Sequence, residues 1–107
     1  MPSQFVKIVV FVPTAHADKV REAMAQAGAG HIGNYDFCSF SSKGIGRFRP
    51  LTGTKPTIGQ IGKLEEVEEE RIETICPHDK VKDVIAAIKS VHLYEEPAID
   101  IYPLENI

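Results

Sequence analysis

The feature that most constrains the fold is a strand–proline–helix pattern that occurs twice. In the first copy, an apolar, β-branched run over residues 5–12 ends at Pro13. An apolar stripe with helical spacing follows it, made of Val20, Ala23, Met24 and Ala27. In the second copy, residues 71–76 lead to Pro77, and the stripe consists of Val81, Val84, Ile85 and Ile88. Apolar residues at i, i+3, i+4 and i+7 are typical of an amphipathic helix. The pattern predicts two strand–helix units, and the nearly unbroken first run predicts a central strand.

The segments outside these units complete the predicted topology. Residues 34–41 alternate in a way that indicates a second strand, and residues 98–102 indicate a short final strand. Residues 64–75 fit a helix almost as well as a strand, but the repeat requires a strand before Pro77. Thr14 or Asp18 is the expected cap of the first helix, and Gly28 its expected stop. The resulting order predicts an α+β, ferredoxin-like βαββαβ fold in a single domain over residues 1–107.

Length and composition limit the class of protein. A chain of 107 residues with 43% hydrophobic and 25% charged residues fits one globular domain. The N-terminus lacks the pattern of a signal peptide, and no apolar run is long enough to cross a membrane. With only two cysteines, the chain is expected to be cytoplasmic with reduced thiols. The net charge of −3 argues weakly against nucleic acid as a partner.

The strongest local signal is a basic, glycine-rich segment followed by an acidic one. All eight glycines lie within residues 28–62, and residues 43–63 hold five cations and no acid. Residues 64–73 then hold six glutamates. We expect a long cationic loop between the middle strands that binds a small anion, such as a phosphate or nucleotide. The alternative is a solvated hairpin loop that pairs with glutamates of a neighbouring segment or subunit. The candidate ligand-binding residues are Lys43, Gly44, Gly46, Arg47, Arg49, Lys55 and Lys63.

Catalytic and metal-binding motifs are weak in this sequence. The glycines do not form a Walker A motif, and no Cys or His pair has a recognised metal-ligand spacing. Nothing orients a Cys/His nucleophilic pair, so no catalytic residue is predicted. The Glu95–Glu96 pair is more typical of a polar turn before a strand. A divalent metal is an alternative ligand, and its candidate residues are His31, Cys38, Cys76, His92 and Glu95.

Several segments together resemble a known module. They are Gly30-His31-Ile32-Gly33-Asn34-Tyr35, Cys38-Ser39-Phe40, Gly46-Arg47-Phe48-Arg49-Pro50, Glu65-x-Val67-Glu68, Arg71-Ile72-Glu73 and residues 92–104. The combination resembles the inserted domain of the Nif-three-like proteins (NGG-one-interacting factor three, or dinuclear metal centre hexameric proteins). A stand-alone version occurs in short YqfO-type proteins. The resemblance covers nearly the whole chain and departs at Leu93, where the family pattern has proline.

This resemblance implies a PII-like and CutA-like unit that assembles as a trimer. CutA-like proteins are similar in the tail, where His92, Tyr94, Glu95 and Pro97 match their His-x-Tyr-Glu-x-Pro pattern. In PII proteins the long loop between the middle strands contacts partners and nucleotides, and residues 43–63 occupy that place by analogy. The family's dinuclear metal ligands lie in flanking domains, so an enzyme is not expected. The leading expectation is a homo-oligomeric binding or regulatory module, and the alternatives are a CutA-like divalent-metal binder and a purely structural assembly module.

Overall fold

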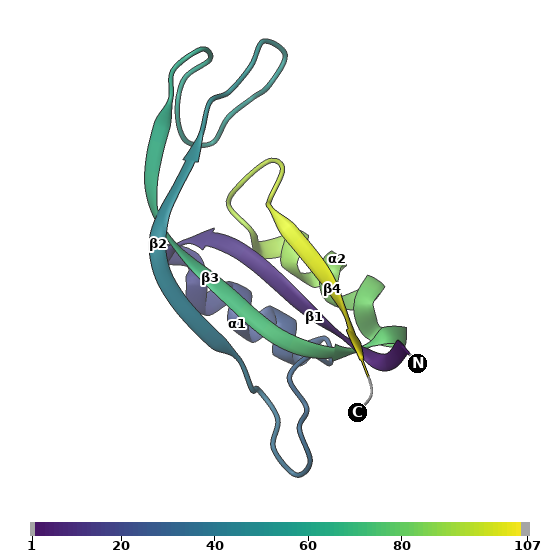
Figure 1. The fold of residues 1–107 in the computed structure, drawn as a ribbon. Helices are drawn as coiled ribbons and strands as arrows, with labels where there is room; N and C mark the ends of the chain where they lie inside the picture. The colour runs from purple at the N-terminus through teal and green to yellow at the C-terminus, as the bar shows by residue number, and fades with distance from the viewer. Residues whose placement is uncertain (1, 106–107) are drawn as a thin grey trace.

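The computed structural model describes residues 2–105 and has four antiparallel strands with two helices (Figure 1). The strands are β1 (Pro2–Pro13), β2 (Phe40–Phe48), β3 (Glu65–Pro77) and β4 (Ile99–Glu105), and the helices are α1 (Ala17–Gln26) and α2 (Val81–Val91). The sheet order is β2-β3-β1-β4. This arrangement confirms the predicted α+β, ferredoxin-like βαββαβ fold. Within the described residues, no helix is both long and apolar enough to cross a membrane.

The strand β1 is central, as its apolar run predicts. It pairs with β3 on one side and with β4 on the other, both antiparallel. Its residues Ile8, Val10 and Val12 belong to one core cluster with Val20 of α1 and Val84 of α2, and all five are completely buried. Because side chains alternate along a strand, the odd-numbered residues of β1 lie on the face opposite the helices. That face carries the candidate site described below.

Both helices begin in the same way after a proline. Pro13 and Pro77 end β1 and β3, and a short 3-10 turn follows each before the α-helix starts (Thr14–His16 and His78–Lys80). The prediction that Thr14 or Asp18 caps the first helix is wrong. The N-cap is His16, without a side-chain hydrogen bond, because the extra 3-10 turn shifts the helix start. Gly28 follows the end of α1 with a φ of 116°, which suits glycine and confirms the predicted stop.

The second strand starts later than predicted. Of residues 34–41, only the last two belong to β2, and residues 31–39 form a loop closed by an Ile32–Tyr35 bridge. The side chains of Tyr35 and Phe37 are exposed, and Phe37 adopts a φ of 56°. The alternation of residues 34–41 therefore does not reflect a half-buried strand, because no neighbouring strand of the described chain pairs with residues 36–39.

The predicted basic loop is also shorter than expected. Residues 43–48 belong to β2, and only residues 49–64 connect the middle strands. In the ladder Lys43 lies opposite Glu70, and Arg47 opposite Glu66. Residues 65–77 form a strand throughout, which settles the helix–strand ambiguity. Residues 65–68 of β3 pair with β2 but not with β1, so the two strands project beyond the sheet as a two-stranded arm (Figure 1).

Candidate functional site

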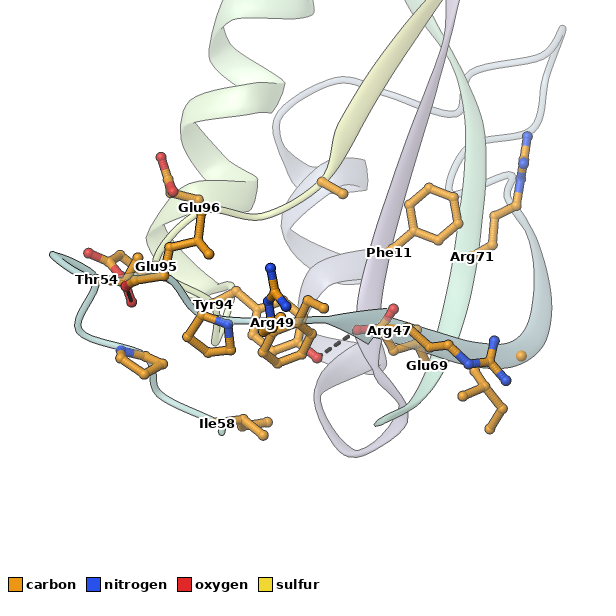
Figure 2. A pocket seen from close by; sticks show the side chains of 18 of the residues that line it. Phe11, Arg47, Arg49, Thr54, Ile58, Glu69, Arg71, Tyr94, Glu95 and Glu96 are labelled. Atoms are coloured by element: carbon orange, nitrogen blue, oxygen red, sulfur yellow. Dashed lines mark hydrogen bonds between the residues drawn. The ribbon is translucent and has the colours of Figure 1, made fainter. Parts of the chain in front are cut away.

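A cavity of about 730 Å³ lies where the arm, the 49–64 loop and the segment after α2 meet (Figure 2). Phe11 of β1 and Arg71 of β3 line it from the face of the sheet opposite the helices. The volume falls in the range of small-molecule sites. Its other lining residues are Ser42, Lys43, Gly44, Ile45, Gly46, Arg47, Phe48, Arg49, Pro50, Leu51, Thr54, Pro56, Ile58, Glu69, Tyr94, Glu95, Glu96 and Ala98.

One wall of the cavity is fixed by Tyr94. Its hydroxyl donates a 2.6 Å hydrogen bond to Glu69, and its ring meets the Phe48 ring edge-on at 5.5 Å. Burial raises the pKa of Tyr94, and the bond to Glu69 raises it further, so the phenol remains a donor. A Cβ atom at Gly46 would overlap the Glu69 carboxylate. Glycine at this strand position thus allows the carboxylate to lie across β2 and reach Tyr94.

His92 holds the same wall against the sheet. Its Nδ1 accepts a hydrogen bond from the Tyr94 backbone amide at 3.0 Å, and its Nε2 lies 2.7 Å from the Phe11 carbonyl. This pairing requires a neutral ring that carries its proton on Nε2. Burial lowers the pKa of His92, although the bond to Phe11 works in the opposite direction. His92 therefore acts here as a neutral positioning residue.

Glu95 attaches the 49–64 loop to the segment after α2. Its carboxylate accepts a hydrogen bond of 3.1 Å from the Lys55 backbone amide. The adjacent turn is closed by Thr54, whose hydroxyl and amide both donate to the Leu51 carbonyl. The residues of the CutA-like tail pattern thus have separate structural contacts: His92 to β1, Tyr94 to β3, and Glu95 to the loop.

The cationic side chains around the cavity differ in how far they are already paired. Arg47 lies 3.4 Å from Glu66. Arg71 stacks over the Phe11 ring at 5.8 Å, and its Nε is buried without a hydrogen-bond partner among the described residues. Arg49 has no hydrogen bond or ion pair within the part of the chain that the structure describes, and Figure 2 shows it pointing into the cavity. The Arg71 Nε also lies 3.6 Å from a carboxylate oxygen of Glu73, so Arg49 is the guanidinium group whose donors are left for a ligand.

Five of the seven predicted ligand-binding residues line this cavity: Lys43, Gly44, Gly46, Arg47 and Arg49. Lys55 and Lys63 do not, although the Lys55 backbone is bonded to Glu95. Sequence reasoning missed Phe11, Glu69 and Arg71. In the sequence Phe11 belongs to a buried apolar run, and the other two belong to an acidic segment. The sequence signal that could have identified them is the alternation of side chains along paired strands. It places Phe11, Glu69 and Arg71 on the same face of the sheet.

The candidate metal ligands are dispersed. His31 lies in the exposed loop before β2, Cys38 is partly buried near the end of that loop, and Cys76 is buried in the core. His92 and Glu95 lie beside the cavity with the hydrogen bonds given above. Among residues 2–105 no group of three or more His, Cys, Asp or Glu side chains is placed to hold a metal ion. Burial also raises the pKa of Cys76, which disfavours the thiolate form that metals bind.

Comparison with known proteins identifies close relatives of this segment. No protein-family model matches the chain. It is 58% identical over 100 residues to the GTP cyclohydrolase 1 type 2 homolog of Halalkalibacterium halodurans, and 54% identical over 100 residues to that of Bacillus subtilis. Each match covers 94% of this chain but only 27% of the relative. The chain therefore spans about a quarter of the length of these curated relatives.

Comparison with solved structures identifies a close relative and a more distant protein of the same fold. A Bacillus cereus protein related to NIF3 superposes with a TM-score of 0.84 at 51% identity, covering 99% of this chain and 27% of that one. The CutA protein of Archaeoglobus fulgidus superposes with a TM-score of 0.70 over 95% of this chain and 85% of its own, at 18% identity, which shows a shared fold. The chain is thus a close relative of one segment of the NIF3-related proteins and has the CutA-like, ferredoxin-like fold.

Proposed function

We propose that the chain is a non-enzymatic, self-associating binding module that takes a small anion or nucleotide in the cavity beside the arm. The observation that carries the proposal is the convergence of Arg49, Arg47 and Lys43 with Arg71, a residue from another strand, around one concave surface. Arg49 has no hydrogen bond or ion pair among the described residues, and guanidinium groups suit phosphate and carboxylate oxygens. We also propose a cytoplasmic location, where both cysteines, which are free in the structure, would stay reduced.

Self-association is proposed as a homotrimer. The support is the likeness in fold to CutA, together with a sheet that has both helices on one face (Figure 1). Exposed apolar side chains occur in the 49–64 loop and at the start of β2, for example Leu51, Leu64 and Phe40. Sedimentation equilibrium tests this part, and a monomer at all concentrations would contradict it.

The binding proposal is tested by titration calorimetry with inorganic phosphate, pyrophosphate and nucleotides. We expect heat from at least one of them, and a clear loss of affinity in Arg49→Ala and Arg47→Ala. Lys63→Ala is the matched control, because Lys63 belongs to the same basic segment but does not line the cavity. If none of the anions binds, the proposed function is wrong.

The names of the longer relatives do not transfer to this chain. The label "GTP cyclohydrolase 1 type 2 homolog" belongs to proteins of which this chain covers 27%. We therefore propose a binding role for this segment and assign no catalytic residue. The divalent-metal alternative remains a prediction without a supporting cluster among the described residues. Metal analysis of the purified protein and of Cys38→Ser tests it.

A further inference from the structure

Residues 92–98 connect α2 to β4 and contain no helix or strand (Figure 1). We call this segment the strap. Both of its ends are bonded to the backbone of one residue of β1. The Phe11 carbonyl lies 2.7 Å from Nε2 of His92, and the Phe11 amide donates a 3.2 Å hydrogen bond to the Ala98 carbonyl. Because the strap has no helical or ladder hydrogen bonds of its own, its position depends on a few single contacts.

His92 uses both of its ring nitrogens on backbone groups. Its Nδ1 accepts a 3.0 Å hydrogen bond from the Tyr94 amide, so the ring proton is on Nε2, which donates to the Phe11 carbonyl. The ring matches these two partners only while it is neutral. A proton on Nδ1 would set two N–H groups against each other and leave the Tyr94 amide without its acceptor. With both nitrogens used in this way, the ring also has no lone pair free for a metal ion.

Two further contacts connect the strap to the wall of the cavity. The Tyr94 hydroxyl donates to Glu69 at 2.6 Å, and the Glu95 carboxylate accepts from the Lys55 amide at 3.1 Å. Lys55 belongs to the loop between the middle strands. Tyr94 and Glu95 follow His92 closely in the chain, so a backbone movement at the Tyr94 amide acts on both contacts. The protonation state of His92 is thereby coupled to the attachment of that loop.

The groups around His92 act on its proton in both directions. Burial lowers the pKa of His92, and the nearby His16 of the 3-10 turn before α1 lowers it as well. The hydrogen bond to Phe11 and the charge of Glu69 on β3 raise this pKa. The C-terminus of α2, which His92 caps, also favours a protonated ring. Because burial is the largest effect, the attached ring takes up a proton less readily than a solvated ring does.

We propose that the strap is a pH-sensitive switch in which protonation of His92 releases Tyr94 and Glu95 and so frees the 49–64 loop. The attached form is fully favoured above the ordinary histidine pKa of about 6.5, and it is lost as the pH falls through the lower pKa of the attached ring. The switch is a property of the free chain, so it does not depend on the proposed anion binding. It would control access to the cavity for any ligand.

Hydrogen exchange followed by NMR between about pH 7.5 and 5 tests the switch. We expect the protection factors of the Tyr94 and Lys55 amides to fall by about fivefold or more, as the loss of one hydrogen bond implies. His92→Gln keeps a neutral donor and acceptor at this position, so both protection factors should stay nearly constant. His31→Gln is the matched control, because His31 is exposed in the loop before β2, and it should behave like the unmodified protein. Glutamates titrate in all three proteins, so an equal fall in His92→Gln overturns the inference, as does no fall in the unmodified protein.

The ring of His92 gives a second readout that needs no variant. Proton–nitrogen correlation spectra at about pH 7.5 should show the proton on Nε2. On acidification, the Lys55 amide shift should change with the same midpoint as the ring. Coincident midpoints support the inference even if His92→Gln does not fold. A proton on Nδ1, or a Lys55 amide that does not follow the ring, overturns it. No ligand enters either experiment, so failure of the anion-binding proposal leaves this inference standing.

Discussion

The hydroxyl of Tyr94 donates a 2.6 Å hydrogen bond to the carboxylate of Glu69, a residue only 7% exposed. This bond joins the segment after α2 to the middle of β3. A buried carboxylate that loses its donor keeps its desolvation cost. We therefore expect Tyr94→Phe to lower the free energy of unfolding by about 1–3 kcal/mol.

Urea denaturation measures this effect. Tyr35→Phe is the control, because Tyr35 is 75% exposed and lies in the loop before β2. If the unfolding free energy falls no further in Tyr94→Phe than in Tyr35→Phe, the hydrogen bond between Tyr94 and Glu69 adds nothing to stability.

Gly46 permits the Tyr94–Glu69 contact. In Gly46→Ala the new Cβ would overlap the Glu69 carboxylate, so that side chain must move away from Tyr94. We expect a loss of about 1–3 kcal/mol in the free energy of unfolding. The double variant with Tyr94→Phe should lose less than the sum of the two single losses, because both disrupt one contact.

The matched control for this variant is Gly44→Ala. Gly44 lies two residues earlier in β2, and a Cβ there meets nothing within 4 Å. Alanine in a strand interior is favoured over glycine, so this control should be neutral or slightly stabilising. Equal losses in the two alanine variants would refute the role given to Gly46.

The sequence predicted the fold because its main signals are local. Pro13 and Pro77 each end a strand before an amphipathic stripe, and both units form as expected. The position of β2 could not be predicted, because the need for glycine at position 46 arises from a contact with a distant strand. Gly46 lies beneath the Glu69 side chain, and that contact depends on the register between β2 and β3.

The candidate site was predictable only in part for the same reason. Arg47 and Arg49 are identified by local charge, and both line the cavity. Arg71 was missed because it lies in a run of glutamates, and its stacking on Phe11 follows from strand pairing. Tyr94 belongs to a recognisable tail pattern, but its bond to Glu69 joins residues 25 positions apart.

Arg21 connects α1 to β3 through Glu70. Its guanidinium lies 2.6 Å from Glu70, whose side chain is 10% exposed. The bonds to Asp18 and to Glu70 raise the pKa of Arg21. We expect Arg21→Gln to cost about 2–4 kcal/mol in the free energy of unfolding, because a buried carboxylate loses its counter-ion.

Chemical denaturation of Arg21→Gln beside Asp18→Asn tests this. The Asp18 side chain is 97% exposed, so its pair with Arg21 should contribute under about 1 kcal/mol. Similar losses of unfolding free energy in the two variants would mean that the burial of Glu70 does not make its ion pair with Arg21 stronger than the exposed pair with Asp18.

His92 makes stability depend on pH in a defined direction. Burial lowers the pKa of His92 in the folded protein relative to the unfolded chain. Between the two pKa values the unfolded chain binds more protons. The stabilising contribution of the neutral ring is therefore present above the unfolded pKa of about 6.5 and is lost as pH falls through the folded pKa. We expect the loss of unfolding free energy between about pH 7.5 and 5.5 to be smaller in His92→Gln than in the unmodified protein, and an identical loss would refute this.

Glu95 fixes the 49–64 loop by accepting a hydrogen bond from the Lys55 amide at 3.1 Å. Without this acceptor the amide is open to solvent, because Lys55 is an exposed residue. We expect Glu95→Ala to speed hydrogen exchange of the Lys55 amide by about tenfold or more. The neighbouring Glu96→Ala removes an equal charge without this bond and should leave the exchange rate unchanged. If both variants speed exchange alike, charge rather than the hydrogen bond controls the exchange of this amide, and Glu95 does not attach the loop to the segment after α2.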